Sequence, residues 1–466
     1  MEKNIVALDL GTSKFALLAA KVLGDNVQVE YYREVPAKGM KYGRIFNTKN
    51  AGEALAPLLK DAEDKLGYKI TSVVVGLPKY PIASASGISE TTDREFDTEI
   101  TEEEISNLKR FAKDSFVLEN DNQQIFEAVA QSFDTDDEFQ VMEDEIVGIT
   151  TTKVKGNIKL FVGSKSDFNN IDILLRKFDI IALRKYFTPV GIGKVTLNDS
   201  EAKGGVALVD FGAGCTSVSI FKDKVLRYYN SFPFGAQSIT NDIEKECGIG
   251  SEIAENIKLA YGACMQEKLQ NMKNKTLRIL GIENNKTVTM KYLSEIISAR
   301  EEEIIMAVLY LIYSSGFGDS ITSIVGTGGG ANLTNLGMFI TKISGCQFRI
   351  GRPNVQYATP DNEVISFTTA NGAIGLLHMA MEEDKLDCGR GVLEENVNDN
   401  TENIEEGENE TLFGEEGGFE VVDEKKEKKK KRKEEKKSPR INLVSKITEG
   451  VSNLFDFGYN LTKDNK

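Results

Sequence analysis

The sequence has no tryptophan and a single histidine, His378, which excludes a histidine-based catalytic triad and a histidine-rich metal site. Its five cysteines are scattered without a C-x-x-C pair, which argues against a zinc site or disulfide framework and favours a reducing compartment. The longest apolar run, residues 304–313, is too short to cross a bilayer. The N-terminus also lacks the basic region of a signal peptide. We therefore expect no integral membrane protein.

The composition is that of a soluble protein large enough for several domains. Hydrophobic residues make up 40% of the 466 residues and charged residues 28%, while 41 glycines against 9 prolines favour tight turns and close backbone approaches. The net charge of −15 is uneven, because residues 382–424 hold 17 acids and 2 bases, and residues 425–437 hold 10 bases and 3 acids. The remaining body is moderately acidic, so no nucleic-acid partner is expected.

Residues 1–381 show mixed strand and helix patterns. Apolar runs predict strands at 5–9, 14–19, 73–75, 145–153, 158–162, 206–209 and 321–325. Helical spacing and capping signals predict helices at 50–66, 101–117, 238–247, 251–261 and 292–313. Residues 180–200 are interpreted as a polar connection. Beyond 381 the composition is typical of a disordered linker, and helical periodicity returns after Ser438.

An internal repeat links the two halves of this body. The run DLGTS begins at Asp9 and the run DFGAG begins at Asp210, and each follows an apolar strand and precedes a second one. The copies lie about 200 residues apart, so the repeated unit is a whole domain.

Such a turn suits a phosphate. Glycine lets the backbone approach an anion closely, and successive N–H groups form an anion-binding nest. Hydroxyl groups at Thr12, Ser13 and Thr216 can donate further hydrogen bonds, while Asp9 and Asp210 can hold the water shell of Mg²⁺. A single copy also fits a plain turn, but two copies on matching strands favour two hairpins that clamp the β- and γ-phosphates.

A glycine-rich turn supplies a third element. The run VGTGGGAN, from Val325 to Asn332, follows a predicted strand and would let the backbone approach an adenine or α-phosphate. An ordinary flexible turn before a helix is the alternative. The run matches neither the Rossmann nor the Walker pattern.

Together these elements resemble the actin-like ATPase superfamily over residues 1–381. The resemblance comprises the first hairpin (9–15), the second hairpin (210–220), the adenosine turn (326–332) and a connecting helix (370–375). Within the superfamily the chain resembles the FtsA family of bacterial cell-division proteins. The motifs that carry this are DLGTSK from Asp9, SFPFG from Ser231, AENIK from Ala254 and ISAREEEI from Ile297.

The resemblance implies a set of nucleotide-binding residues and leaves the catalytic residues unknown. They are Gly11, Thr12, Ser13, Lys14, Gly212, Ala213, Gly214, Cys215, Thr216, Gly235, Glu255, Lys258, Gly328, Gly329 and Asn332. Glu255 and Lys258 would approach the ribose, although by themselves they also fit a surface ion pair. The second hairpin departs from the family pattern, because Ala213 replaces a glycine and Ser217 an aspartate. ATP binding is expected to survive this, whereas hydrolysis is left open, and Cys215 is interpreted as a small loop residue.

The predicted fold is α/β: an actin-like ATPase fold with two duplicated α/β domains around a nucleotide cleft and an inserted extra subdomain. The expected parts are a first core domain (1–83, 164–203 and 370–384), the FtsA-type insertion (84–163), a second core domain (204–239 and 311–369), its outer lobe (240–310), a linker that is acidic and then Lys-rich (385–437), and a helix (438–457).

That last segment has an apolar stripe at helical spacing. The stripe consists of Val444, Ile447, Val451, Leu454 and Phe455, and it follows the Lys-rich tract. The interpretation is an amphipathic membrane-binding helix, as in the family. A helix docked on the body or on a partner is the alternative.

The function implied by the resemblance is that of an actin-like cell-division protein. It would bind ATP and Mg²⁺, polymerise at the cytoplasmic face of the inner membrane at the division site, and tether FtsZ there. FtsZ would dock at 240–300, with membrane lipids, further copies of the chain and later division proteins as the other partners. A pilus-assembly-type actin homologue that scaffolds a membrane complex, or a small-molecule kinase on the same fold, are the alternatives. A heat-shock-type chaperone is excluded, because no β-rich peptide-binding domain follows the body.

Overall fold

A computed structural model of the chain describes residues 2–24, 26–91, 97–279, 286–355, 357–360, 364–392 and 419–423. These residues form two compact units. The first contains residues up to Ala236, Leu311–Asn332 and Cys346–Val392. The second contains Gln237–Tyr310, Leu333–Gly345 and the strand Phe419–Asp423. The second unit thus contains residues 333–345 in addition to the outer lobe that we expected at 240–310. We had expected these residues in the second core domain.

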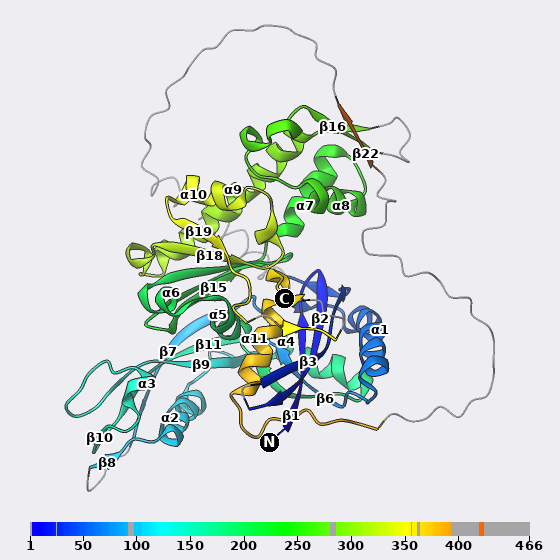
Figure 1. The fold of residues 1–466 in the computed structure, drawn as a ribbon. Coiled ribbons are helices and arrows are strands. Elements are labelled where there is room, and N and C mark those ends of the chain that lie inside the picture. Colours follow the sequence, from blue (N-terminus) through cyan, green and yellow to red (C-terminus); the bar gives the residue numbers. More distant parts are fainter. Residues whose placement is uncertain are drawn as a thin grey trace, which may run out of the picture. The chain divides into compact units, whose positions relative to one another are not determined.

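Two five-stranded sheets make up the centre of the first unit (Figure 1). The first has the order β12-β6-β1-β2-β3, and the second has the order β15-β14-β13-β18-β19. The strands of the first are β1 (Glu2–Leu10), β2 (Lys14–Leu23), β3 (Asn26–Pro36), β6 (Ser72–Gly76) and β12 (Ile181–Tyr186). Those of the second are β13 (Val206–Phe211), β14 (Thr216–Lys222), β15 (Val225–Phe232), β18 (Ser323–Thr327) and β19 (Gln347–Ile350).

The two sheets have the same topology. In the first sheet, β1, β2 and β3 pair antiparallel in sequence order, while β1 pairs parallel with β6 and β6 with β12. In the second sheet, β13, β14 and β15 pair antiparallel in the same way, while β13 pairs parallel with β18 and β18 with β19. The first hairpin closes at the pair Leu10–Phe15 and the second at Phe211–Thr216. The duplicated, actin-like α/β organisation predicted from the repeated motif is confirmed.

Helices and short strands complete the first unit outside the inserted lobe. The helices are α1 (Thr48–Leu66), α4 (Lys165–Leu175), α5 (Thr188–Thr196), α6 (Asp199–Gly204) and α11 (Asn371–Met381), with 3₁₀ turns η1 (Arg176–Phe178), η4 (Gly318–Ser320), η5 (Gly330–Asn332) and η6 (Thr368–Ala370). The short strands are β4 (Met40–Lys41), β5 (Arg44–Ile45), β20 (Tyr357–Ala358) and β21 (Val364–Ile365). Helix α1 begins at the N-cap Asn47 and ends at Gly67, which has a φ of 71°.

The polar connection expected at 180–200 is wrong. Residues 181–186 form strand β12, which pairs with β6, and residues 188–196 form helix α5, which packs against α11. Two glycines and Pro189 give α5 a weak helical pattern, so its helical state depends on tertiary burial rather than on propensity. Strand β12 lies at the edge of its sheet, where Arg184 and the apolar Ile181 are both exposed, so its sequence lacks the alternation of a half-buried strand.

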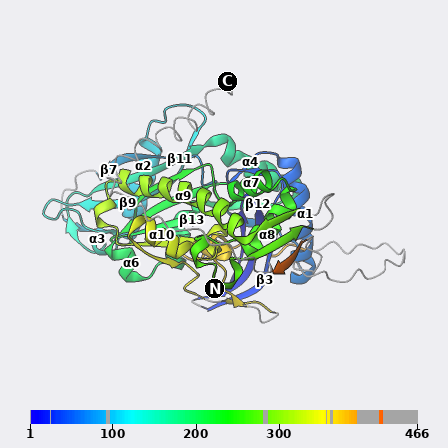
Figure 2. The same cartoon turned by 90° about the horizontal axis from the view of Figure 1, so that it is seen from above.

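Residues 83–164 form a lobe with its own sheet and core (Figure 2). Its elements are β7 (Ala83–Glu90), β8 (Thr98–Glu99), α2 (Glu102–Ser115), β9 (Gln123–Asp134), α3 (Glu143–Ile146), β10 (Thr150–Thr151) and β11 (Lys155–Ser164). Helix α2 begins with the capping box of Thr101 and Glu104. Of the strand expected at 145–153, only Thr150–Thr151 forms a strand, β10, because the start of the segment belongs to α3, whose acidic first turn suits a helix N-terminus.

This lobe is inserted after β6 of the first sheet, yet its base is bonded to β15 of the second. Lys159 donates a hydrogen bond to the carbonyl of Arg227, and Gln131 donates to the carbonyl of Leu226 at 3.1 Å. The ring of Phe161 stacks on Phe187 at 5.0 Å between centroids, and Tyr229 meets both rings edge-on. The lobe therefore contacts elements of both duplicated halves.

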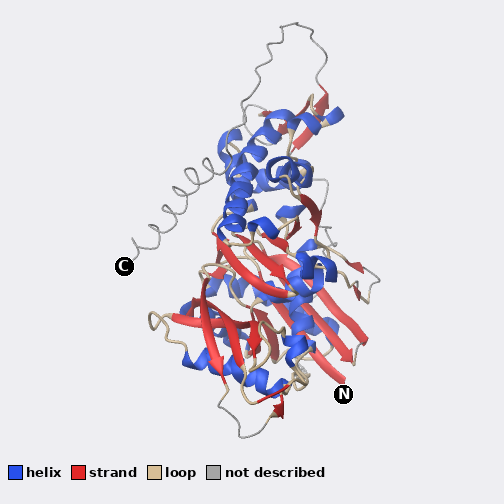
Figure 3. Cartoon of the chain, turned by 90° about the vertical axis from the view of Figure 1, so that its left-hand side faces the viewer, coloured by secondary structure: helices blue, strands red, loops and turns tan. Residues whose placement is uncertain are grey.

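Helices make up most of the second unit (Figure 3). They are α7 (Ala236–Cys247), α8 (Ser251–Tyr261), α9 (Met290–Ser314) and α10 (Leu336–Ser344), with 3₁₀ turns η2 (Gln266–Lys268) and η3 (Gln270–Met272). A small sheet pairs β16 (Lys275–Ile279) with β17 (Thr287–Thr289) and β22 (Phe419–Asp423).

The linker expected to begin at residue 385 begins later. The side chains of Leu386 and Cys388 are buried, and the backbone N–H of Cys388 donates to the carbonyl of Asn4 at 2.7 Å. Cys388 thus contacts β1, the central strand of the first sheet, and the described body continues to Val392. Residues 419–423, also assigned to the linker, form strand β22. The rest of the linker and the helix at 438–457 lie outside the described residues. Among the described residues, no helix is long and apolar enough to cross a membrane.

Candidate functional site: two facing hairpins in the first unit

The turns of the two duplicated hairpins meet. The first turn contains Gly11, Thr12 and Ser13, and the second spans Gly212 to Cys215. A Cβ added to Gly214 would lie 2.6 Å from Cγ2 of Thr12, so the two turns are in direct contact. The hydroxyl of Thr12 also accepts a hydrogen bond from the N–H of Gly43 at 2.8 Å. The structure thus brings together the two motifs that the sequence places about 200 residues apart.

Gly212 is required by the shape of the second turn. A Cβ at this position would lie 2.6 Å from the carbonyl oxygen of Cys215, a separation that real Cβ atoms essentially never show. The Gly212 carbonyl accepts from the N–H of Ala236 at 3.0 Å, and a Cβ on Gly235 would lie 2.2 Å from that carbonyl. Thr216 donates to the carbonyl of Phe234 at 3.0 Å. Gly235 and Thr216 therefore hold the second turn from the side of α7.

Asp9 and Asp210 lie at matching positions near the ends of β1 and β13. Burial raises the pKa of Asp9 above its usual value, while Lys79 and Lys14 act to lower it. Asp210 pairs with Lys79, with 2.6 Å between the ammonium and Oδ2. The predicted pair of acids is thus present, and a cation that the sequence analysis missed stands beside it.

Lys14, predicted to contact the nucleotide, is held within the first sheet. Its ammonium lies 2.6 Å from Oε2 of Glu34. Oε1 of the same carboxylate accepts from the Tyr32 hydroxyl at 2.5 Å and from the Thr369 hydroxyl at 3.0 Å. Burial lowers the pKa of Lys14, and Glu34 opposes that effect. Apart from this ion pair, Nζ of Lys14 is buried without a hydrogen-bond partner, so its other N–H donors are not used within the described residues.

The glycine-rich turn after β18 packs directly against the second hairpin. Gly328 has a φ of +81°, and a Cβ there would lie 2.3 Å from Oδ1 of Asp210, so both the backbone conformation and the space demand glycine. The carbonyl of Gly328 accepts from Thr368 at 3.0 Å, and Asn332 donates to the same Thr368 hydroxyl at 2.8 Å. A Cβ added to Gly329 would have its nearest neighbour 3.8 Å away, at Cγ2 of Thr369. The turn is therefore tied to the segment that leads into α11.

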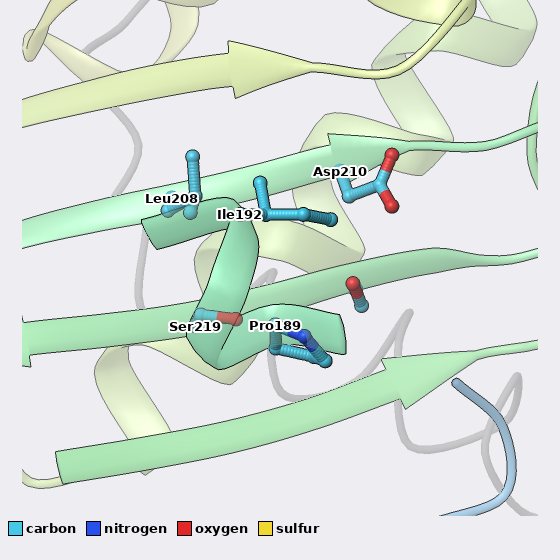
Figure 4. Close-up of a pocket in the computed structure, with 6 residues that line it drawn as sticks. Pro189, Ile192, Leu208, Asp210 and Ser219 are labelled. Carbon is cyan, nitrogen blue, oxygen red and sulfur yellow. The ribbon is translucent and has the colours of Figure 1, made fainter. Parts of the chain in front are cut away.

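A small cavity lies behind Asp210 (Figure 4). Its volume of about 10 Å³ is enough for one water molecule at most. It is lined by Pro189, Ile192, Leu208, Asp210, Ser217 and Ser219. The serine hydroxyls and the carboxylate give it a polar side, although it is far too small for a nucleotide.

Cys215 agrees with its interpretation as a small residue of the turn. Its thiol is buried, and burial raises its pKa to about 12, opposite to what a reactive thiolate needs. Within the described ranges, no group of three or more His, Cys, Asp and Glu side chains could hold a metal ion by itself. A metal bound mostly by protein side chains therefore has no candidate among these residues.

Glu255 and Lys258 belong to the second unit and form a partly buried cluster there with Thr240. Lys258 is 7% exposed and donates to Glu255 at 2.7 Å and to Thr240 at 2.9 Å, and Thr240 in turn donates to Glu255. A surface ion pair, the alternative for these two residues, would leave the lysine in solvent. Thr240, Glu255 and Lys258 thus form one connected polar group.

Glu301 of α9 is a further buried acid that the sequence analysis quoted only within a motif. It is 1% exposed, and its Oε2 is buried without a hydrogen-bond partner. Burial raises the pKa of Glu301 to about 8, although Lys258 acts to lower it. Ile297, Ile304 and Ile305 occupy the same helical face and are also buried, which is the periodic signal that could have located it.

Comparison with known proteins agrees with this geometry. A family model described as cell division protein FtsA matches residues 207–372. The cell division protein FtsA of Neisseria meningitidis serogroup B is 28% identical over 387 residues, covering 81% of this chain and 90% of that protein. The cell division protein FtsA of Bacillus subtilis is 24% identical over 352 residues, covering 75% and 78%.

A solved structure titled PilM-PilN type IV pilus biogenesis complex covers 81% of this chain and 99% of the matched chain, with a TM-score of 0.57 and 12% identity. At that identity the likeness shows the actin-like fold alone and gives no support to a pilus-assembly role. The sequence matches and the duplicated sheets with facing hairpins agree with one another. Over about four fifths of its length the chain is similar to cell division proteins FtsA, and its fold is actin-like.

Proposed function

We propose that this actin-like cell-division protein binds ATP with Mg²⁺ between its two hairpins, polymerises on the inner membrane at the division site, and tethers FtsZ filaments there. The observation that supports nucleotide binding is the contact between Thr12 and Gly214, which joins two turns of phosphate-binding type. The family relationship supports the division-site role. The tail segment 438–457 supplies the proposed membrane contact.

The residues around Asp9 and Asp210 fit a hydrated magnesium ion. Mg²⁺ keeps several waters and binds through one or two carboxylates plus substrate phosphates. The hydroxyl of Thr188 is buried without a hydrogen-bond partner, and an added Cβ on Gly76 would lie 2.8 Å from it and 3.6 Å from Oδ1 of Asp9. The Thr188 hydroxyl is therefore suited to hydrogen-bond a water molecule of the Mg²⁺ hydration shell. When bound, the ion would neutralise phosphate charge, and Asp9 and Asp210 would hold its waters.

The membrane role predicts that substituting Val451→Glu together with Phe455→Glu abolishes sedimentation with anionic vesicles. Burial of apolar surface contributes about 25 cal/mol per Å², and a short helix binds as weakly as a single lipid anchor, with K of about 10⁴ M⁻¹. Polymerisation would link many such anchors and raise avidity. The measurement is co-sedimentation of the full chain with vesicles and FtsZ, with and without ATP.

The matched control is Ser445→Glu with Ser452→Glu, which adds the same charge to the expected polar face of the helix. This control is expected to keep most vesicle binding, and the apolar-face variant is expected to keep ATP binding. Equal sedimentation of parent and apolar-face variant would contradict the membrane role and favour a docked helix.

The proposed FtsZ site predicts that Leu259→Asp weakens binding of the FtsZ C-terminal peptide. Leu259 on α8 is 66% exposed, the highest value among the large apolar side chains described in residues 240–300, and a short partner segment needs such an anchor. We expect a loss of at least about tenfold, typical of an interface anchor. Exchange of the whole lobe would be uninformative, because it would also remove Glu255 and Lys258.

Fluorescence anisotropy with a labelled peptide measures this affinity. Met338→Asp on α10, at a side chain that is 46% exposed and lies outside 240–300, is the control and is expected to bind like the parent. If Leu259→Asp also binds like the parent, the peptide docks elsewhere.

A further inference from the structure

Lys79 joins the two duplicated halves of the first unit. It follows strand β6 of the first sheet, and its ammonium lies 2.6 Å from Oδ2 of Asp210 near the end of β13 in the second sheet. Its side chain is 21% exposed and that of Asp210 is 13% exposed, so the pair is largely shielded from solvent. A charge pair with this little solvent around it is screened weakly by salt.

The backbone of Lys79 is fixed by the second half. Its carbonyl accepts hydrogen bonds from the Tyr229 hydroxyl at 2.6 Å and from the Ser231 hydroxyl at 2.7 Å, both on β15. The Tyr229 ring is itself buried against Phe161 and Phe187. The position of the ammonium is therefore set by a packed sheet rather than by a free loop.

The same ammonium serves both acids of the candidate phosphate site. Asp210 is its direct partner, and Asp9 is close enough for Lys79 to act on its ionisation. The direct contact with the Asp210 carboxylate stabilises the charged form of Lys79. Without this cation, two buried carboxylates would repel each other and an incoming triphosphate.

We propose that Lys79 is a built-in counter-ion that lets the site hold ATP without a divalent cation, so that binding depends only weakly on Mg²⁺. The inference rests on the proposed ATP binding at the two hairpins. A lysine ammonium binds phosphate as a compact point charge, and a charge-assisted hydrogen bond in a shielded site is about twice as strong as a neutral one. Lys79 thus neutralises part of the phosphate charge that Mg²⁺ neutralises when it is bound to ATP.

The test is calorimetric titration of the full chain with ATP, in excess Mg²⁺ and in excess EDTA. In the parent, removal of Mg²⁺ is expected to weaken binding by less than about tenfold. In Lys79→Met the metal-free affinity is expected to fall by at least about 30-fold and the Mg²⁺-ATP affinity by no more than about threefold, as for loss of one charged contact that the ion can replace. Lys185→Met is the matched control, since Lys185 is also a shielded lysine, 2.7 Å from Asp172.

Tyr229→Phe gives a second, milder variant that keeps the ring and removes the hydroxyl bond to the Lys79 carbonyl. It is expected to weaken metal-free binding by about threefold, the effect of one neutral hydrogen bond, and to leave Mg²⁺-ATP binding unchanged. Thermal unfolding of each variant shows whether it is folded.

The outcomes separate the two proposals. An equal loss in both titrations for Lys79→Met, or a parent that binds ATP only with Mg²⁺, overturns the counter-ion role and leaves ATP binding standing. If Lys79→Met does not fold, Tyr229→Phe decides by the same criterion. A parent that binds ATP in neither titration overturns the proposed function and the counter-ion role with it.

Discussion

Gly212→Val is expected to abolish ATP binding while the chain remains folded. Even a single added carbon would lie 2.6 Å from the carbonyl of Cys215, so the second turn must open and its N–H groups must turn away from the phosphates. Loss of two charge-assisted hydrogen bonds, each of about 1.5–3 kcal/mol, weakens binding by more than about 100-fold. Calorimetric titration of the full chain with Mg²⁺-ATP measures the change.

Gly204→Val is the matched control, because an added Cβ at Gly204 meets no atom within 4 Å and its φ is unremarkable. Both variants lose the same backbone freedom in the unfolded chain, so a difference between them reports the turn itself. An affinity for Gly212→Val within a few-fold of that for Gly204→Val would rule out this turn as a phosphate site.

Glu301→Gln is expected to stabilise the protein at alkaline pH and to leave it nearly unchanged in acid. The folded-state pKa of Glu301 is raised to about 8 by burial, so its protonated form is favoured by folding. The stability contributed by that proton is fully present below the unfolded pKa of about 4.3 and is lost as pH rises through about 8. At 1.36 kcal/mol per pKa unit, the cost to the parent reaches up to about 5 kcal/mol above pH 8, and the neutral amide avoids it.

Unfolding midpoints of the parent and the variant at pH 5, 6.5, 8 and 9 test this. The gap between the two proteins is expected to widen steadily with pH. Glu302→Gln, at an exposed neighbouring position of α9, is expected to follow the parent throughout. A constant gap between Glu301→Gln and the parent would show that Glu301 is already ionised in the folded protein or never buried.

The hairpins were predictable because their chemistry is local. Asp9, Gly11, Asp210 and Gly212 each follow an apolar strand, and the requirement for glycine arises from atoms three residues away in the same turn. The duplication of the motif then implied the duplication of the sheet. Nothing in this inference needed knowledge of a distant contact.

Lys79 could not be found in the same way. In the sequence it follows Leu77 and Pro78 and looks like an ordinary charged turn residue, and its partner Asp210 is 131 positions away. The two meet because the Lys79 carbonyl is hydrogen-bonded to Tyr229 and Ser231 of β15, a strand of the sheet that contains Asp210. A single charge after a buried strand is a signal for such a site, but it does not say which partner the charge meets.

Helix α5 and Glu301 show the other limit, where tertiary packing overrides local pattern. Residues 188–196 are small and glycine-containing, so they look like a connection until α11 packs on them. Glu301 stands among three consecutive glutamates and looks like part of a solvated face. The helical conformation of residues 188–196 and the burial of Glu301 both depend on the elements that pack against them. A single sequence does not reveal which elements these are.

The attachment of the inserted lobe has a consequence for how this protein can change over evolutionary time. A module that folds and binds alone can be lost, exchanged or grafted, but this lobe shares the ring of Phe161 with Phe187 and Tyr229. Removal of the lobe would expose the rings of Phe187 and Tyr229. It would also loosen Tyr229, whose hydroxyl donates a hydrogen bond to the Lys79 carbonyl. Substitutions at the base of the lobe are therefore expected to affect the phosphate site as well, although the two lie in different parts of the sequence.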